Sequence, residues 1–364
     1  MINQVSSQRI ALIRFPLAVG VVYGHSYASE IGYADGTIGI SNTSNIVEFI
    51  RYIISNELAH ATAPLFFLLS GYLFFVKFEW SLKAFSRKIV SRFHSLLVPF
   101  LFWNLSAWII IHSAKLFPST RIYFSEPFIR FDSYSFWGII NSIFGIDQTP
   151  AAYPLWFLRD LIILVLLVPL LQLVLHTIPR IFLCLTFLLW FFKIWLLYLP
   201  SILSVFFFYF GAYWAVFRKD LFEVDKYRVW ITISYFIILF IDFFSRNSAS
   251  YLYIHQICIF SGILFFLQIT QFAHRFIFVQ YYLLLLSTYS FFIYVSHEPL
   301  LTIIRKLTFR YVAPGSSATI LMLYLALPII TIILSLLIYK FLYVASPVFL
   351  NLITGKRINY KTSK

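Results

Sequence analysis

Charged residues are scarce in this chain of 364 residues: Asp, Glu, Lys and Arg make up 12% of it, whereas a soluble domain has about 25%. Hydrophobic residues account for 61% and aromatic residues for 21%. So little polar surface excludes a water-soluble globular protein. Because its apolar runs reach the length of bilayer-crossing helices, the composition predicts an all-α polytopic membrane protein.

Cysteine and local catalytic motifs are also scarce. Cys184 and Cys258 are the only cysteines and lie within apolar runs, so we expect neither a disulfide framework nor a metal site. The sequence has no G-x-S-x-G motif, no metal-ligand spacing, no phosphate-binding glycine loop and no heptad repeat. We therefore expect no metal and no permanently bound cofactor.

The net charge of +14 is the property that would suggest a nucleic-acid partner. However, no basic block is interleaved with aromatic residues outside the apolar runs, so no such partner is expected. The basic residues instead lie in short loops between apolar runs, as in a membrane protein. A cleaved signal peptide is not expected either, because the first apolar run is long, contains Arg14 and Pro16, and lacks an A-x-A site.

About ten apolar runs are long enough to cross a bilayer. Their approximate limits are 10–29, 58–78, 96–113, 154–175, 181–198, 202–217, 229–244, 252–270, 281–304 and 320–343. Loops on the side of both termini carry about twice as many Lys and Arg residues as the opposite loops, which places the termini in the cytoplasm. We predict one membrane domain over 1–364, with a short basic cytoplasmic tail at 357–364 and no appended soluble domain.

Arg14 and His25 are two ionisable residues in the first predicted span. In an ideal helix, eleven residue steps separate them by about 16 Å along the axis and about 20° around it. Ionisable groups within a span are costly and usually functional. The alternative is that Arg14 reaches the headgroups while His25 bonds a neighbouring helix, but two such residues on one stripe favour function.

The predicted topology places several further polar residues in the outer half of the membrane with His25. They are His60 in the second span, Arg159 and Asp160 in the fourth, and His297 and Glu298 in the ninth. Ionisable groups at one depth favour a single polar cavity. The alternative is that these residues lie separately at the membrane interface, on helices that do not contact one another.

Two loops are candidates for substrate contact. The cytoplasmic loop at about 77–99 is the densest basic segment; attraction to anionic lipid is its ordinary interpretation, and a surface for a phosphorylated donor is the functional one. The external loop 114–153 is long enough to be a lid or recognition element. It contains Glu126, Asp132 and Asp147 but no histidine.

Short blocks along the chain together resemble membrane acyltransferase family 3, the integral membrane O-acyltransferases of bacterial envelope sugars. The blocks are R-x10-H at Arg14 and His25, PLFFLLSGYLFF at 64–75, the basic segment 87–99, PLWFLRDLIILVLLVPLL at 154–171, FYFGAYWA at 208–215 and SFFIYVSHEPLL at 290–301. Two positions depart from the family's pattern. Ala11 stands where Asp is frequent, and His60 stands where Arg is frequent.

The resemblance implies transfer of an acyl group, most often acetyl, from cytoplasmic acyl-CoA to a sugar hydroxyl. The acceptor would be an envelope polysaccharide or its lipid-linked precursor, and the enzyme would lie in the bacterial cytoplasmic (inner) membrane. The length of an extended pantetheine arm is of the same order as the distance of about 16 Å predicted between Arg14 and His25. His25 would act as general base on the hydroxyl.

Other roles follow from the same resemblance. Asp160 or Glu298 would orient His25, and His297 or Arg159 would stabilise the oxyanion or bind the sugar. The candidate ligands of the CoA phosphates are Arg14, Arg87, Lys88 and Arg92. Ser70 and Gly71 would let the second span approach a neighbouring helix or the pantetheine arm, and helix packing is the simpler reading. The candidate acceptor-binding residues are Arg159, His60, Trp156 and Tyr294.

The expected partners are acyl-CoA, a glycan or lipid-linked glycan acceptor and membrane lipid. The sequence does not decide whether the chain forms a homo-oligomer. Two other classes also stay open. A polysaccharide flippase or exporter needs buried charges, but it gives no reason for Arg14 and His25 to share a stripe and would not bind acyl-CoA. A glycan polymerase or ligase would concentrate its catalytic residues in a long external loop, and the loop 114–153 lacks histidine.

Overall fold

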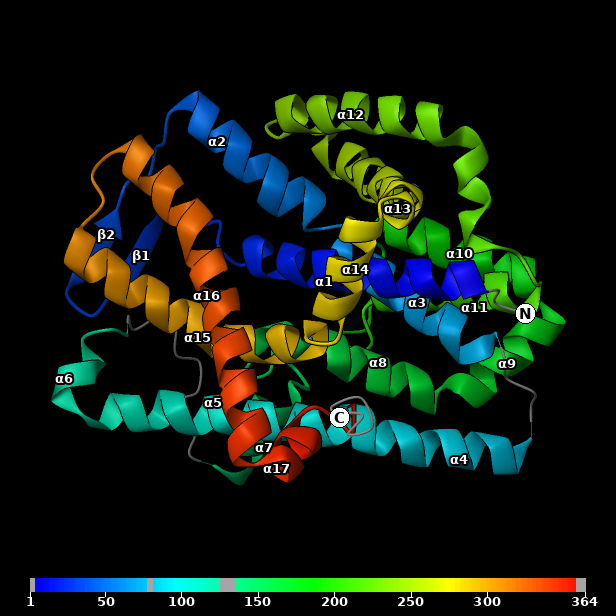
Figure 1. Cartoon of the computed structure of the whole chain (residues 1–364), viewed down its shortest axis with the longest axis horizontal. Helices are drawn as coiled ribbons and strands as arrows, with labels where there is room; N and C mark the ends of the chain where they lie inside the picture. Colours follow the sequence, from blue (N-terminus) through cyan, green and yellow to red (C-terminus); the bar gives the residue numbers. More distant parts are fainter. Residues whose placement is uncertain (1–3, 77–80, 125–134, 358–364) are drawn as a thin grey trace. The chain divides into compact units, whose positions relative to one another are not determined.

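The computed structural model describes residues 4–76, 81–124 and 135–357. The predicted basic tail, apart from Arg357, lies outside the described residues, as do Glu126 and Asp132 of the external loop. The described chain is mostly helical, with one short hairpin (Figure 1). It divides into two compact units: Met1–Gly24, Tyr52–Ile89 and Ile163–Ser290 form the first unit, and His25–Arg51, Val90–Ile162 and Phe291–Lys364 form the second unit.

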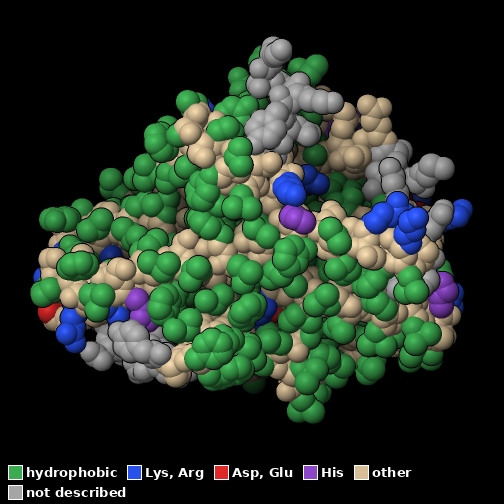
Figure 2. Space-filling model, turned by 90° about the horizontal axis from the view of Figure 1, so that it is seen from below, with side chains coloured by type: hydrophobic (Ala, Val, Ile, Leu, Met, Phe, Trp, Pro, Cys, Tyr) green, Lys and Arg blue, Asp and Glu red, His purple; other side chains and the backbone are tan. Residues whose placement is uncertain are grey.

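Six helical segments of the described residues are long and apolar enough to cross a membrane. They are Gln4–Gly24, Asn45–Phe75, Leu82–Leu116, Leu221–Ser245, Tyr251–Arg275 and Ser317–Ala345. Two bent pairs raise the number to eight if each pair is one span: Tyr153–Leu166 with Val168–Thr177, bent by 62°, and Ile277–Ser287 with Ser290–Val312, bent by 61°. Hydrophobic side chains cover much of the face seen in Figure 2, as lipid contact requires.

The predicted helical, many-span fold is confirmed, but the count of ten is not. Each predicted span coincides with a helix or a bent pair, and two of them coincide with the shorter apolar helices α10 (Pro179–Phe191) and α11 (Ile202–Val216). These have 13 and 15 residues, fewer than the roughly 20 that span a bilayer core. The cytoplasmic location of the termini stays a prediction.

In the first unit, α3 (Thr62–Phe75) and α11 cross at two glycines. A Cβ atom on Gly71 would lie 2.0 Å from the carbonyl oxygen of Phe208, and one on Gly211 would lie 1.9 Å from that of Leu68. Side chains of any size would therefore force the two backbones apart. Gly71 thus serves helix packing, which is the simpler of its two predicted roles.

The N-terminal helix α1 (Gln4–Gly24) is held in the first unit by Arg9. Its guanidinium pairs with Asp225 at 2.5 Å and donates hydrogen bonds to Thr270 Oγ1 and the carbonyl of Leu267. These partners lie on η5 (Leu221–Tyr227) and α13 (Tyr251–Arg275). Arg9 was predicted to be a loop residue, whereas it lies within α1 and is 5% exposed.

The same unit contains a long pair, α12 (Arg228–Ser245) and α13, which lie side by side (Figure 1). Tyr235, Leu239 and Cys258 form a buried cluster between them. The unit also contains α9 (Val168–Thr177), α10, α14 (Ile277–Ser287) and most of α4 (Leu82–Arg92). The π-helical segment η1 (Ile53–Leu58) packs against α1 and α13.

The second unit begins with a feature that the sequence analysis missed. Strands β1 (Glu30–Tyr33) and β2 (Gly36–Gly39) form an antiparallel hairpin directly after Ser29, the predicted end of the first span, whereas helix α1 already ends at Gly24. Tyr33 of the hairpin donates a hydrogen bond to the carbonyl of Lys306 at 2.7 Å. Burial raises the pKa of Tyr33 to about 12, so this phenol stays a donor at neutral pH.

Around the hairpin, the second unit is built from α2 (Asn45–Tyr52), α5 (Val98–Leu116), α15 (Ser290–Val312), α16 (Ser317–Ala345) and α17 (Pro347–Ile353). Its core includes Phe292, Leu350 and Ile353. The long external loop is partly helical, with α6 (Pro118–Arg121) and α7 (Phe136–Phe144). It leads into α8 (Trp156–Leu166).

Candidate functional site

Helix α15 is interrupted in the middle, and the interruption places two predicted site residues. Pro299 has no amide hydrogen and disfavours helical geometry in the residue before it. Glu298 accordingly has φ −113° and ψ 130°, which is extended backbone inside a helix. The break leaves carbonyl groups of the preceding turn free to accept side-chain hydrogen bonds.

His297 makes use of this freed backbone. It is completely buried, and its Nδ1 lies 2.6 Å from the carbonyl oxygen of Tyr294. A carbonyl only accepts, so Nδ1 carries the proton in the neutral ring and Nε2 holds the lone pair. Nε2 has no hydrogen-bond partner among the described residues. His297 therefore presents a basic nitrogen.

His25 lies beside His297 in the second unit. It is the first residue after α1, whose helix continues unbroken from Arg14 to Gly24. Its ring stacks on that of His297, with centroids 5.5 Å apart, and meets the ring of Tyr153 edge-on at 4.9 Å. Arg305 donates a hydrogen bond from Nη1 to the carbonyl of His25 at 3.0 Å. Two imidazoles are thus held within one small polar cluster.

Glu298 completes this cluster. Its Oε1 accepts a hydrogen bond from the Tyr153 hydroxyl at 3.2 Å, and its Oε2 accepts one from the backbone amide of Thr302 at 3.3 Å. Arg305, seven residues after Glu298 on α15, brings its guanidinium to the same cluster through its hydrogen bond to the His25 carbonyl. A carboxylate and a guanidinium therefore lie beside the two imidazoles.

Arg159 and Asp160 form a separate pair at the start of α8. The Nη2 of Arg159 lies 3.1 Å from Asp160 Oδ1, and its Nη1 donates to the carbonyls of Gly145 at 2.5 Å and Gln148 at 3.3 Å. Gly145 has φ +65°, and a Cβ there would lie 2.9 Å from this guanidinium. Arg159 thus ties the end of α7 to α8, a structural use that the sequence did not suggest.

Trp156 and Tyr294, which were predicted to bind the acceptor, also lie near the start of α8. Trp156 is its first residue and is half-buried. The hydroxyl of Tyr294 donates to the carbonyl of Pro154 at 2.7 Å, and its ring contacts that of Phe157. Tyr294 therefore fastens α8 to α15 next to His297. Binding of a sugar by either residue stays a prediction.

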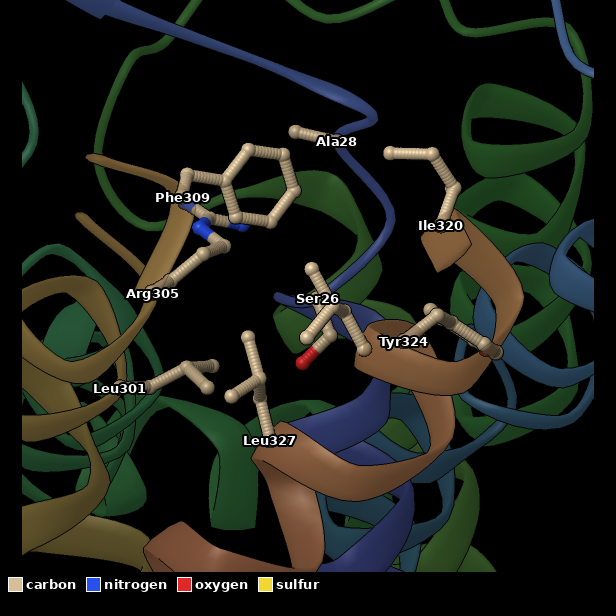
Figure 3. A pocket seen from close by; sticks show the side chains of 9 residues that line it. Ser26, Ala28, Leu301, Arg305, Phe309, Ile320, Tyr324 and Leu327 are labelled. Atoms are coloured by element: carbon tan, nitrogen blue, oxygen red, sulfur yellow. The ribbon is translucent and has the colours of Figure 1, made fainter. Parts of the chain in front are cut away.

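A small pocket of the second unit adjoins the cluster. Figure 3 shows Leu301 and Arg305 of α15 on one side and Tyr324 and Leu327 of α16 on the other, with Ser26 between them. Ser26 follows His25 directly, and Arg305 bonds the His25 carbonyl. The Nε of Arg305 is buried and has no hydrogen-bond partner among the described residues. The pocket therefore combines apolar walls with an available cationic donor.

The residues that were predicted to bind acyl-CoA are spread along the chain. Arg14 on α1 and Arg87 on α4 (Leu82–Arg92) are exposed, while Lys88 bonds the carbonyl of Phe74. Arg92 ends α4 and is half-buried. Arg92 falls in the second unit, whereas the first unit contains the others: Arg14, Arg87, Lys88, Ser70 and Gly71. Their joint binding of CoA phosphates stays a prediction.

His60 has a different environment from the other outer-half residues. It belongs to the first unit, where its Nδ1 lies 2.9 Å from Nε2 of His255. His25, Arg159, Asp160, His297 and Glu298 all belong to the second unit. Acceptor binding by His60 stays a prediction.

Two members of the cluster, Tyr153 and Arg305, were not predicted from the sequence. Tyr153 directly precedes the PLWFLRD block, and Arg305 was counted only as a loop charge although it lies seven residues after Glu298. The helical spacing was a usable signal for Arg305. No local pattern marked Tyr153, because its partners His25 and Glu298 are distant in sequence.

Comparisons with known proteins agree with these features. A family model described as an acyltransferase domain matches residues 8–340. The succinoglycan biosynthesis protein ExoH of Rhizobium meliloti (strain 1021) is 26% identical over 177 residues, which cover 48% of this chain and 45% of the relative. The match thus spans less than half of the relative's length. No solved structure matches the chain.

Proposed function

Because this chain belongs to acyltransferase family 3, we propose that it transfers an acyl group, in the simplest case acetyl, from cytoplasmic acyl-CoA to a sugar hydroxyl. The proposed acceptor is a cell-envelope polysaccharide or its lipid-linked precursor. The name of the relative refers to biosynthesis of a glycan, succinoglycan, which supports a glycan acceptor. The proposed location is the bacterial inner membrane, with both termini in the cytoplasm.

The observation that carries the proposal is the cluster of His25, His297, Tyr153, Glu298 and Arg305 next to the pocket. Acyl transfer to a hydroxyl needs a base for the hydroxyl proton and a donor for the developing oxyanion. Imidazole is the side chain whose ordinary titration range suits the first task. A guanidinium with an unpartnered N–H suits the second. Both groups are present within this cluster.

In the proposed reaction, His25 accepts the proton of the sugar hydroxyl while the hydroxyl oxygen attacks the thioester carbonyl. The tetrahedral intermediate collapses with cleavage of the carbon–sulfur bond. The proton returns from His25 to the departing CoA sulfur, so the products are the sugar ester and free CoA. Glu298, through the Tyr153 hydroxyl, holds the ring that contacts His25, which is a positioning role.

The contacts of Arg159 and His297 lead us to propose other roles for these two residues. Arg159 is engaged by Asp160 and by two backbone carbonyls, so Arg305 replaces it as the proposed oxyanion donor. The neutral His297 accepts rather than donates at Nε2. We therefore propose that His297 serves as a second base beside His25 rather than as a donor to the oxyanion. Arg14, Arg87, Lys88 and Arg92 remain the proposed ligands of the CoA phosphates.

The reaction can be tested with the full chain purified into liposomes. Isotope-labelled acetyl-CoA and a lipid-linked glycan acceptor are supplied, and both free CoA and labelled glycan are measured. We expect the two products in equal amounts from the wild type and neither from His25→Ala. Equal background release by both proteins, with no labelled glycan, would contradict acyl transfer and favour the exporter alternative.

A further inference from the structure

A buried cluster in the first unit has no part in the proposed reaction. We propose that Glu57, Asp242 and His255 form a binding site for a divalent transition-metal ion, with Zn²⁺ as the best match. The three residues come from η1, α12 and α13. The inference uses only contacts within the first unit and does not depend on the proposed acyl transfer.

The geometry of the three side chains suits one ion. One potential ligand atom from each residue lies within 4.8 Å of the other two. Nδ1 of His255 is 3.1 Å from Oδ2 of Asp242 and 3.8 Å from Oε1 of Glu57. Ligand atoms of a tetrahedral zinc ion lie roughly 3.5 Å apart, because each is about 2.0–2.3 Å from the metal. Small side-chain rotations would therefore admit an ion.

The hydrogen bonds of the cluster leave two carboxylate oxygens unsatisfied. Tyr52 donates to Asp242 Oδ2 at 2.8 Å, and Cys258 donates to Glu57 Oε2 at 2.6 Å. Oδ1 of Asp242 and Oε1 of Glu57 are buried and have no hydrogen-bond partner among the described residues. Buried polar atoms without partners are costly. A cation would satisfy both oxygens.

The charges of the cluster point to the same ligand. Glu57 and Asp242 are 2% and 0% exposed, and His255 is the only basic side chain within ion-pair distance of either among the described residues. When both carboxylates are ionised, one imidazole does not balance their charge, and excess negative charge is left in an apolar region. Such charge persists in a protein interior when it is paired or coordinates a metal.

The second ring nitrogen of His255 is also arranged as in metal sites. A metal-binding histidine usually donates a hydrogen bond from the nitrogen that faces away from the metal, which fixes the tautomer. Nε2 of His255 lies 2.9 Å from Nδ1 of His60. When this bond is donated by His255, its Nδ1 presents a lone pair toward both carboxylates.

The donor set favours zinc over the alkaline-earth ions. Ca²⁺ and Mg²⁺ take mostly or entirely oxygen ligands, and six or more of them, whereas Zn²⁺ accepts carboxylate, imidazole and thiolate in a set of four. Cys258, whose sulfur lies 2.6 Å from Glu57, is placed to become the fourth ligand. A set of four protein ligands would make the site structural and would join η1, α12 and α13.

Metal content of the detergent-purified full chain tests the proposal. Cells are grown with added zinc, and metals are counted by mass spectrometry in the wild type, Glu57→Gln and Asp242→Asn. Glu223→Gln is the matched control, because Glu223 is an exposed glutamate of the same unit. We expect about one zinc ion per chain in the wild type and the control, with loss in both cluster variants, since each removes one ligand.

A second measurement keeps the test decisive if a variant does not fold. Chelator-treated wild-type protein is titrated with Co²⁺, which reports thiolate ligation and tetrahedral geometry by visible absorption. We expect saturation at about one ion per chain, and Cys258→Ser should lose the sulfur-to-metal band while still binding Co²⁺. The proposal would be overturned if the wild type bound neither Zn²⁺ nor Co²⁺ saturably. The carboxylates of the cluster would then be neutralised by protons instead of by a metal ion.

Discussion

His297 has one ring nitrogen bonded to the Tyr294 carbonyl and the other without a hydrogen-bond partner among the described residues. At the residue scale, this asymmetry follows from Pro299, whose ring interrupts α15 and frees the carbonyls before it. The block that contains both residues was recognisable in the sequence. The stacking of His297 on His25 was not, because nothing local relates residues so far apart along the chain.

Removal of the Tyr153 hydroxyl tests the positioning role of Glu298. Tyr153→Phe keeps the ring that contacts His25 but loses the hydrogen bond to Glu298. A hydrogen bond contributes about 0.5–1.5 kcal/mol, so we expect the transfer rate to fall about threefold to tenfold. The rate is measured with labelled acetyl-CoA in liposomes. Tyr227→Phe is the control because Tyr227 is exposed, and equal rates for both variants would refute the role.

Replacement of Arg305 tests the proposed oxyanion donor. Arg305→Lys keeps the charge but lacks the planar group that bonds the His25 carbonyl. Loss of an oxyanion donor lowers kcat about 10²–10³-fold, and we expect a fall in that range with KM for acetyl-CoA little changed. Arg310→Lys is the control, since Arg310 of the same helix pairs with Asp35. A similar fall in the control would show that general changes in α15 cause the loss.

At the scale of elements, the crossing of α3 and α11 depends on glycine. The two glycines lie in the blocks at 64–75 and 208–215, and the sequence predicted close packing at Gly71 but not at Gly211. The sequence could not identify which helix faces which, because that pairing is set by tertiary contacts. The hairpin β1–β2 was missed because each of its strands has only four residues, too few to show a clear alternation of polar and apolar residues.

Gly211→Ala tests this crossing. The new methyl group would lie 1.9 Å from the carbonyl oxygen of Leu68, so the helices must separate. Overpacking of this kind costs about 1–3 kcal/mol or more, and we expect a lower midpoint of thermal unfolding in detergent. Gly315→Ala is the matched control, because a Cβ there meets no atom within 4 Å. An unchanged midpoint for Gly211→Ala would contradict the close crossing.

At the scale of the whole molecule, composition and apolar length identified a helical membrane protein, and block order identified its family. The division into two units was not foreseen, since each unit combines three separate stretches of chain. The cluster of Glu57, Asp242 and His255 was missed for the same reason. Glu57 and Asp242 are distant in sequence from His255, and only His255 and Cys258, three residues apart, are close enough to share a ligand spacing.

The predicted topology can be tested by reporter fusions. Alkaline phosphatase is active only outside the cytoplasm, and the loop charges place the C-terminus inside. We expect a fusion after Lys364 to be inactive and a fusion after Pro314, which precedes α16, to be active. The reverse pattern would contradict the predicted orientation, and equal activity would contradict α16 as a span.

The most direct test of acyl transfer by this chain is mass spectrometry of envelope polysaccharide. Cells with the wild-type gene are compared with a deletion strain and with strains that carry His25→Ala or, as control, His176→Ala at an exposed histidine. The account predicts loss of one acyl substituent in the deletion and His25→Ala strains, unchanged glycan amount, and full acylation in the control. A fall in total glycan with acylation intact would contradict it.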